Sequence, residues 1–65
     1  MTKAEYREYF AQCKPLLRMS YFLRLAGIGD SNFSYFMKGN DFLLSLEKLE
    51  LLYNCIGNEL NSKVV

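Results

Sequence analysis

The stretch of sequence that decides the fold is GIGDSNFSYFMKG, which runs from Gly27 to Gly39. Apolar side chains return at fixed offsets from its first glycine, at Ile28, Phe33 and Phe36. This spacing predicts two short helices, over about 19–26 and 30–38, that meet at a tight turn and share one core. Gly27 is expected to end the helix over 19–26. Its own backbone should take the left-handed conformation, which glycine adopts at little cost.

The second of these helices has a free face that is almost entirely polar. Most of its side chains are neutral hydrogen-bonding groups, which suit the edges of DNA bases. The candidate base contacts are Asp30, Ser31, Asn32, Ser34 and Tyr35. Basic side chains that flank the helix pair are natural partners for backbone phosphates. The candidate phosphate contacts are Lys14, Arg18 and Lys38.

The rest of the chain also shows helical patterns. Thr2, with Glu5 three residues later, predicts a capping box at the start of a first helix, in which Lys3 and Arg7 face water. Pro15 either ends that helix or opens the next. No segment predicts a strand. We therefore expect one all-α domain over residues 1–65, with four or five short helices.

A last helix is expected to begin at a Ser45 cap and to end at Gly57-Asn58. Its predicted apolar stripe is Leu46, Leu49, Leu52 or Tyr53, and Ile56. The tail over 58–65 either holds a short helical turn or is frayed. The predicted core comprises Phe22, Ile28, Phe33, Phe36, Leu46 and Leu49.

Composition points towards self-association. The chain has 65 residues, of which 51% are hydrophobic and 15% aromatic. A domain this small buries only about 60% of its unfolded surface, so some apolar side chains should stay outside its core. We expect a homodimer whose interface includes Leu43, Tyr53, Ile56 and Leu60. Tyr21, Leu25, Leu43 and Leu44 are expected to form either an exposed partner surface or an extension of the core.

Charge and cysteine content narrow the class of protein. The formal net charge is only +1, but residues 14–40 carry four basic side chains against one acidic side chain. The two cysteines form no CxxC pair and are expected to be reduced. The charged N-terminus is not expected to be a signal peptide, and no apolar run approaches the roughly 20 residues of a membrane span. These features favour the cytoplasm of a bacterium or of a phage-infected host.

An enzyme is not expected. The chain has no histidine, which removes the commonest general base and the commonest zinc ligand. It has no metal-ligand cluster and no glycine-rich phosphate loop. We therefore expect no cofactor, no metal and no small-molecule ligand.

Over residues 17–57 the sequence resembles the Cro and CI phage repressor family. The matching positions are Phe22-Leu23, Gly27-Ile28-Gly29, Asn32-Phe33-Ser34, Gly39 and the run Ser45-Leu46-Glu47-Lys48-Leu49. The resemblance implies a lambda-repressor-like helix-turn-helix bundle, with a recognition helix from about Asp30 to Lys38. It also implies a dimeric transcription regulator that occupies an inverted-repeat operator in double-stranded DNA, as Cro does, and so represses transcription.

The chain departs from the family pattern at several positions. Leu23 replaces the usual alanine, and Ala26 replaces a bulky residue, an exchange that conserves volume. Gly29 replaces the serine that usually caps the recognition helix, so Asp30 is expected to take over the cap. The cap position of the preceding helix falls on Arg18, a poor capping residue, which leaves Ser20 as an alternative start.

A second class of function remains open from the sequence. The low net charge and the surplus of apolar side chains also fit a phage-type inhibitor or adaptor, a protein-interaction module that retains the helix-turn-helix fold. The salt dependence of DNA binding separates the two readings, because only a DNA binder releases counterions from phosphates.

Overall fold

The computed structural model describes the backbone of residues 1–64 and the side chains of residues 1–59. This part of the chain forms four helices and no strand, which confirms the expected all-α class. The helices are α1 (Lys3–Cys13), α2 (Met19–Ala26), α3 (Asp30–Met37) and α4 (Leu46–Val64).

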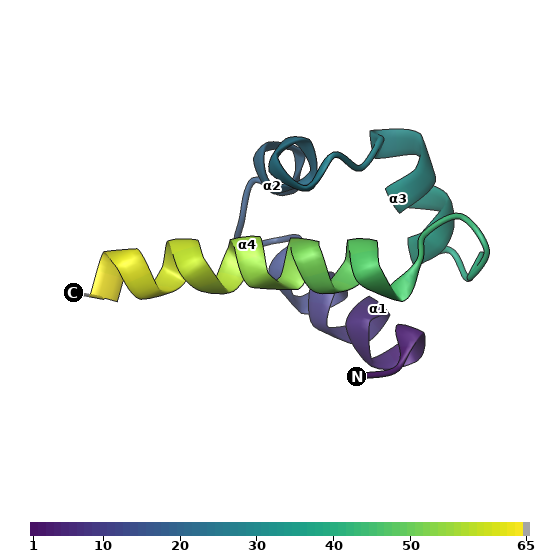
Figure 1. The fold of residues 1–65 in the computed structure, drawn as a ribbon, viewed down its shortest axis with the longest axis horizontal. Helices are drawn as coiled ribbons and strands as arrows, with labels where there is room; N and C mark the ends of the chain where they lie inside the picture. Colours follow the sequence, from purple (N-terminus) through teal and green to yellow (C-terminus); the bar gives the residue numbers. More distant parts are fainter. Residues whose placement is uncertain (65) are drawn as a thin grey trace.

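The long helix α4 is the axis on which the other elements are arranged (Figure 1). Helix α2 packs most extensively on α4, and α1 contacts both α4 and α3. Helices α2 and α3 also contact each other, so the pair that the sequence predicts is held on the scaffold of α1 and α4. None of the described helices has both the length and the apolar content that a membrane span needs.

One core joins all four helices. Its fully buried side chains are Phe10, Phe36, Leu49, Leu52 and Ile56, and the last four lie at apolar positions predicted from the sequence. Phe22, Ile28 and Phe33 are also buried in the same cluster, as expected. Each helix therefore contributes an apolar face at helical spacing to a shared interior.

The predicted capping box at the start of α1 is present. The backbone N–H of Glu5 donates to Thr2 Oγ1 at 3.2 Å, and the backbone N–H of Thr2 donates to Glu5 Oε1 at 2.8 Å. Hydrogen bonds to the Glu5 carboxylate from the backbone and the side chain of Thr2 favour its charged form and lower the pKa of Glu5. Helix α1 then ends at Cys13, and Pro15 lies in the turn beyond it, so Pro15 does not open the next helix.

The turn between α2 and α3 has the predicted geometry. Gly27 has φ +72° and ψ +31°, in the left-handed region. The backbone N–H of Ile28 donates to the carbonyl of Leu23 at 2.9 Å. This bond closes a Schellman-type end to α2 and directs Ile28 into the core.

Two expectations about helix ends are wrong. Helix α4 does not end at Gly57-Asn58 but continues through both residues to Val64. A glycine inside a helix costs only about 1 kcal/mol relative to alanine, and the buried stripe before Gly57 outweighs this local cost. Gly29, not Asp30, is the N-cap of α3, so Asp30 is the first residue of the helix. Helix α2 begins at Met19, as expected, and not at the alternative start Ser20, although Arg18 gives it no side-chain cap.

The predicted core is wrong at Leu46, and Leu44 is a core residue instead. Leu46 is 50% exposed, whereas Leu44 is buried, which is the second of the two alternatives left open for it. The loop before α4 turns Leu44 inward, and the stripe of α4 therefore begins one turn later, at Leu49. Tyr21, Leu25 and Leu43 are exposed, so they remain available as an apolar surface.

Candidate nucleic-acid interface

Two phenylalanines fix the rotation of α3 about its own axis. Phe33 and Phe36 are both buried, and the Phe33 ring lies edge-on to Phe10 of α1 with centroids 5.9 Å apart. Residues three apart lie on one face of a helix, so this pair turns the rest of α3 outward. This outward face is the polar face on which the sequence predicts the base contacts.

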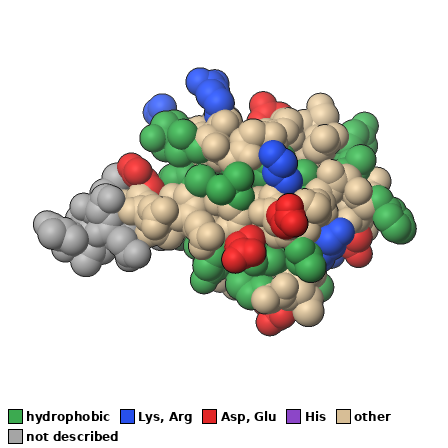
Figure 2. Space-filling model, viewed as in Figure 1, with side chains coloured by type: hydrophobic (Ala, Val, Ile, Leu, Met, Phe, Trp, Pro, Cys, Tyr) green, Lys and Arg blue, Asp and Glu red, His purple; other side chains and the backbone are tan. Residues whose placement is uncertain are grey.

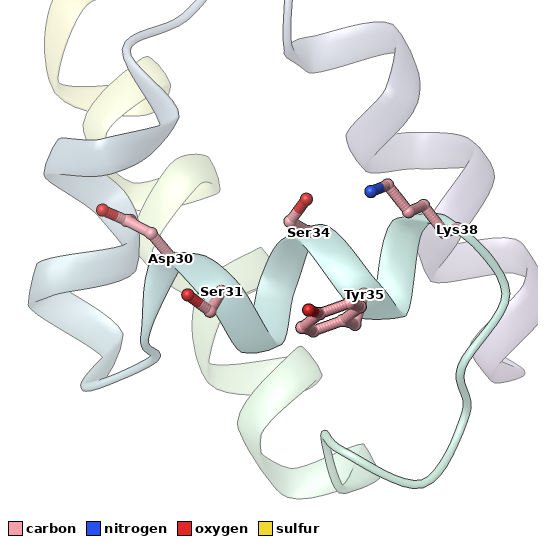
Figure 3. A pocket seen from close by; sticks show the side chains of 5 residues that line it. All are labelled: Asp30, Ser31, Ser34, Tyr35 and Lys38. Atoms are coloured by element: carbon pink, nitrogen blue, oxygen red, sulfur yellow. The ribbon is translucent and has the colours of Figure 1, made fainter.

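The outward face of α3 gathers most of the predicted base contacts around one shallow depression. The depression has a volume of about 270 Å³, and its lining residues are Asp30, Ser31, Ser34, Tyr35 and Lys38. Figure 3 shows four of these side chains on α3, with Asp30 at its start, and Lys38 directly after its C-terminal end. Asn32 is exposed but does not line this depression, so it stands apart from the other four candidate base contacts.

The charges on α3 are separated along the helix. Asp30 lies in the first turn, where its negative charge complements the helix dipole. The Lys38 ammonium lies 5.7 Å from the centroid of the Tyr35 ring, within the range of a cation–π contact. Between the two ends, Ser31, Ser34 and Tyr35 present uncharged hydrogen-bonding groups.

The other two candidate phosphate contacts lie apart from this depression. Lys14 and Arg18 are exposed at the ends of the connection between α1 and α2, where they follow α1 and precede α2. The structure therefore groups Lys38 with the candidate base contacts and does not group Lys14 and Arg18 with them.

Sequence reasoning missed Arg24 as a member of this region. A second depression, of about 210 Å³, lies where α2 approaches the start of α3, and its lining residues are Ser20, Arg24, Ile28, Gly29 and Asp30. Ser20 and Arg24 are four residues apart and share a face of α2. This spacing in the sequence could have indicated that Arg24 belongs to the region. Asp30 lines both depressions and therefore connects them.

Acidic residues are more frequent along α4 than beside α2. Figure 2 shows basic side chains at the upper edge near α2, and acidic and basic side chains next to each other lower on the same face. Along the described part of α4, Glu47, Glu50 and Glu59 outnumber Lys48, whereas α2 carries Arg24 and no acidic residue. A polyanion is therefore better accommodated beside α2 than along α4.

The candidate dimer contacts have different environments. Leu43 is exposed, and Tyr53 is partly exposed with its ring against Tyr9, at a centroid distance of 4.9 Å. Ile56 is fully buried in the core of the single chain, so it has no surface to offer a second copy. Leu60 lies outside the residues whose side chains the structure describes.

No known protein family, curated protein or solved structure matches this chain. Among the described residues there is also no group of three or more His, Cys, Asp or Glu side chains that could hold a metal ion. The features that bear on function are therefore the geometry and chemistry of α3 and its surroundings.

Proposed function

We propose that the chain is a helix-turn-helix transcription regulator of the Cro-like type. In this proposal α2 and α3 form the helix-turn-helix, and α3 enters the major groove of double-stranded DNA. Occupancy of the operator then represses transcription in a phage, plasmid or mobile element. The observation that carries the proposal is the division of α3 into two faces, one anchored by Phe33 and Phe36 and the other polar and uncovered.

The size and chemistry of α3 support this role. An α-helix with its side chains is about 10–12 Å across, which fits the major groove, and the eight residues of α3 provide about two turns for base contacts. Serine hydroxyls can donate to or accept from base edges, and the carboxylate of Asp30 can accept from cytosine N4. Tyr35 can contact a thymine methyl group with its ring or a phosphate with its hydroxyl.

In this mode of binding, charge contributes less to the affinity than base contacts and dimerisation do. The proposed phosphate contacts are Lys14, Arg18 and Lys38, or three per chain. Each phosphate contact contributes roughly 0.9 to the slope of log affinity against log salt. The expected slope is therefore modest, and the affinity relies on base contacts and on a second copy of the chain.

The proposed functional unit is a homodimer that binds an inverted repeat. Two recognition helices related by a two-fold axis read half-sites about 34 Å apart. Leu43 and Tyr53 are the proposed interface residues whose surfaces the structure describes. Sedimentation of wild type and of Leu43→Lys tests the assembly, with Leu16→Lys as a control at another exposed leucine. A monomer at high concentration, both free and on DNA, contradicts the dimer.

Selection of bound sequences from a random DNA pool tests the function directly. We expect an inverted repeat to emerge and to outcompete a scrambled duplex of the same composition across a salt series. If no sequence outcompetes the scrambled DNA, the chain is not a sequence-specific DNA binder.

A protein-interaction module is the second candidate function. The observation that favours it is the exposure of large apolar side chains, above all Phe42, which is 96% exposed on the loop between α3 and α4. Under this alternative, DNA binding is weak and shows no sequence preference. Substitutions at Phe42, rather than on α3, then remove the biological activity.

A further inference from the structure

Arg7 of α1 connects three features around the C-terminal end of α3. Its Nε donates to the carbonyl oxygen of Phe36 at 2.9 Å, and its Nη2 forms an ion pair with the carboxylate of Asp41. The guanidinium carbon also lies 4.6 Å from the centroid of the Phe36 ring. The sequence pattern placed Arg7 in water, but its side chain is only 24% exposed.

Neighbouring contacts hold the same segment in place. Lys3, one turn before Arg7 on α1, donates from Nζ to the carbonyl oxygen of Asp41 at 2.6 Å. The backbone N–H of Phe42 donates to the side chain of Asn40 at 3.1 Å. The loop that leaves α3 is therefore attached to α1 through both the backbone and the side chain of Asp41.

The contact with Phe36 also adds a donor at the C-terminal end of α3. The last carbonyls of a helix have no partners within the helix, and the helix dipole makes this end negative. The Phe36 carbonyl already accepts from the backbone N–H of Gly39 at 3.0 Å. Arg7 adds a charge-assisted donor to the same oxygen, which is the stronger kind of hydrogen bond.

We propose that Arg7 is a positioning residue for DNA recognition. It fixes the C-terminal half of α3 and the following loop against α1, and thereby sets where Ser34, Tyr35 and Lys38 meet the bases and phosphates. This inference rests on the proposed DNA-binding function. Arginine is required because its planar fork serves two acceptors at once, whereas lysine supplies a single point charge.

Amide hydrogen exchange of Arg7→Met, Arg7→Lys and Asp41→Asn tests the attachment without DNA. In Arg7→Met we expect the amides of Gly39 and Asn40 to lose protection by at least about tenfold, the factor expected for one charge-assisted hydrogen bond. Amides in the middle of α4 should lose less. The other two variants should change in the same direction by smaller factors, and they keep the test valid if Arg7→Met does not fold. A uniform loss across the chain would mean that Arg7 stabilises the whole domain and positions nothing.

Binding to the selected operator and to scrambled DNA tests the consequence for recognition. In Arg7→Met the ratio of the two affinities should fall roughly threefold to tenfold, because base contacts depend on placement more than phosphate contacts do. Arg18→Met is the matched control, since it removes one positive charge at a proposed phosphate contact that lines neither depression. It should leave α3 protection unchanged and reduce both affinities equally. An unchanged ratio in Arg7→Met overturns the inference. If wild type prefers no sequence, the proposed function fails, while the exchange experiment still judges the attachment.

Discussion

The ammonium of Lys48 lies 3.5 Å from the carbonyl oxygen of Ala26, so a side chain from α4 reaches the C-terminal end of α2. Ala26 is the last residue of α2, where the carbonyls lack partners within the helix and the dipole is negative. A cation at this position complements both features. The turn at Gly27 is thus held from the scaffold as well as by its own backbone conformation.

Replacing Lys48 with methionine should lower stability slightly. The substitution keeps an unbranched side chain but removes the donor to Ala26, which we expect to reduce the free energy of unfolding by about 0.5–1 kcal/mol. Chemical denaturation measures the change. The matched control is Lys14→Met, at an exposed lysine between α1 and α2. Equal effects at the two positions would show that general charge, and not the bond to Ala26, is responsible.

The two glycines of the turn should differ in their tolerance of a side chain. At Gly27, with φ +72°, alanine should destabilise the domain by about 1–2 kcal/mol, since a Cβ is strained in the left-handed region. Gly27→Val should be worse because its side chain is branched. Gly29 has φ −71° and open space around a Cβ, so Gly29→Ala should be close to neutral. Thermal melting distinguishes the pair, and equal losses would place the strain elsewhere.

Gly57→Ala should stabilise the protein. Gly57 lies inside α4, and a Cβ added there meets no other atom within 4 Å. Alanine is favoured over glycine in a helix interior by roughly 0.5–1 kcal/mol. The midpoint of chemical denaturation should therefore rise. A fall would indicate that the helix does not continue through this residue in solution.

Stability should decrease between pH 10 and pH 12 because of Tyr9. Burial, together with a hydrogen bond and a charge interaction with Cys13, raises the pKa of Tyr9 from 10.0 to about 12. In this interval the folded chain keeps a proton that the unfolded chain has lost, so a rise in pH favours unfolding. Burial also raises the pKa of Tyr6 and adds to the same trend. Melting temperatures across this range should show a smaller decrease in Tyr9→Phe. Tyr21→Phe, at an exposed position, should leave the decrease intact.

Substitutions on α3 should weaken DNA binding in two different ways. Ser31→Ala and Tyr35→Ala remove proposed base contacts, so each should cost roughly 1–3 kcal/mol on the selected operator and little on scrambled DNA. Lys38→Ala removes a proposed phosphate contact. It should weaken binding to both duplexes and reduce the salt slope by about one unit per chain. Titrations across a salt series measure both effects. If these variants bind as wild type does, α3 is not the recognition helix.

The sequence alone determined the features that depend on local chemistry. Thr2 and Glu5 predicted the capping box, because that bond pattern involves only residues three apart. Gly27 predicted the turn, since its backbone conformation excludes most other residues. Helical periodicity likewise predicted that Phe33 and Phe36 face inward and that polar side chains of α3 face outward.

Only the tertiary structure decided what depends on neighbours distant in the sequence. Periodicity gives a helix an apolar face but does not say which elements cover it, so the exposure of Leu46 and the burial of Leu44 were not predictable. Gly57 locally favours an end to α4, yet the packed stripe before it sustains the helix. Arg7 looked like a solvent residue because its partners, Phe36 and Asp41, are 29 and 34 positions away. Long-range contacts such as these form only when the chain is folded, and here they hold the outward face of α3 in place.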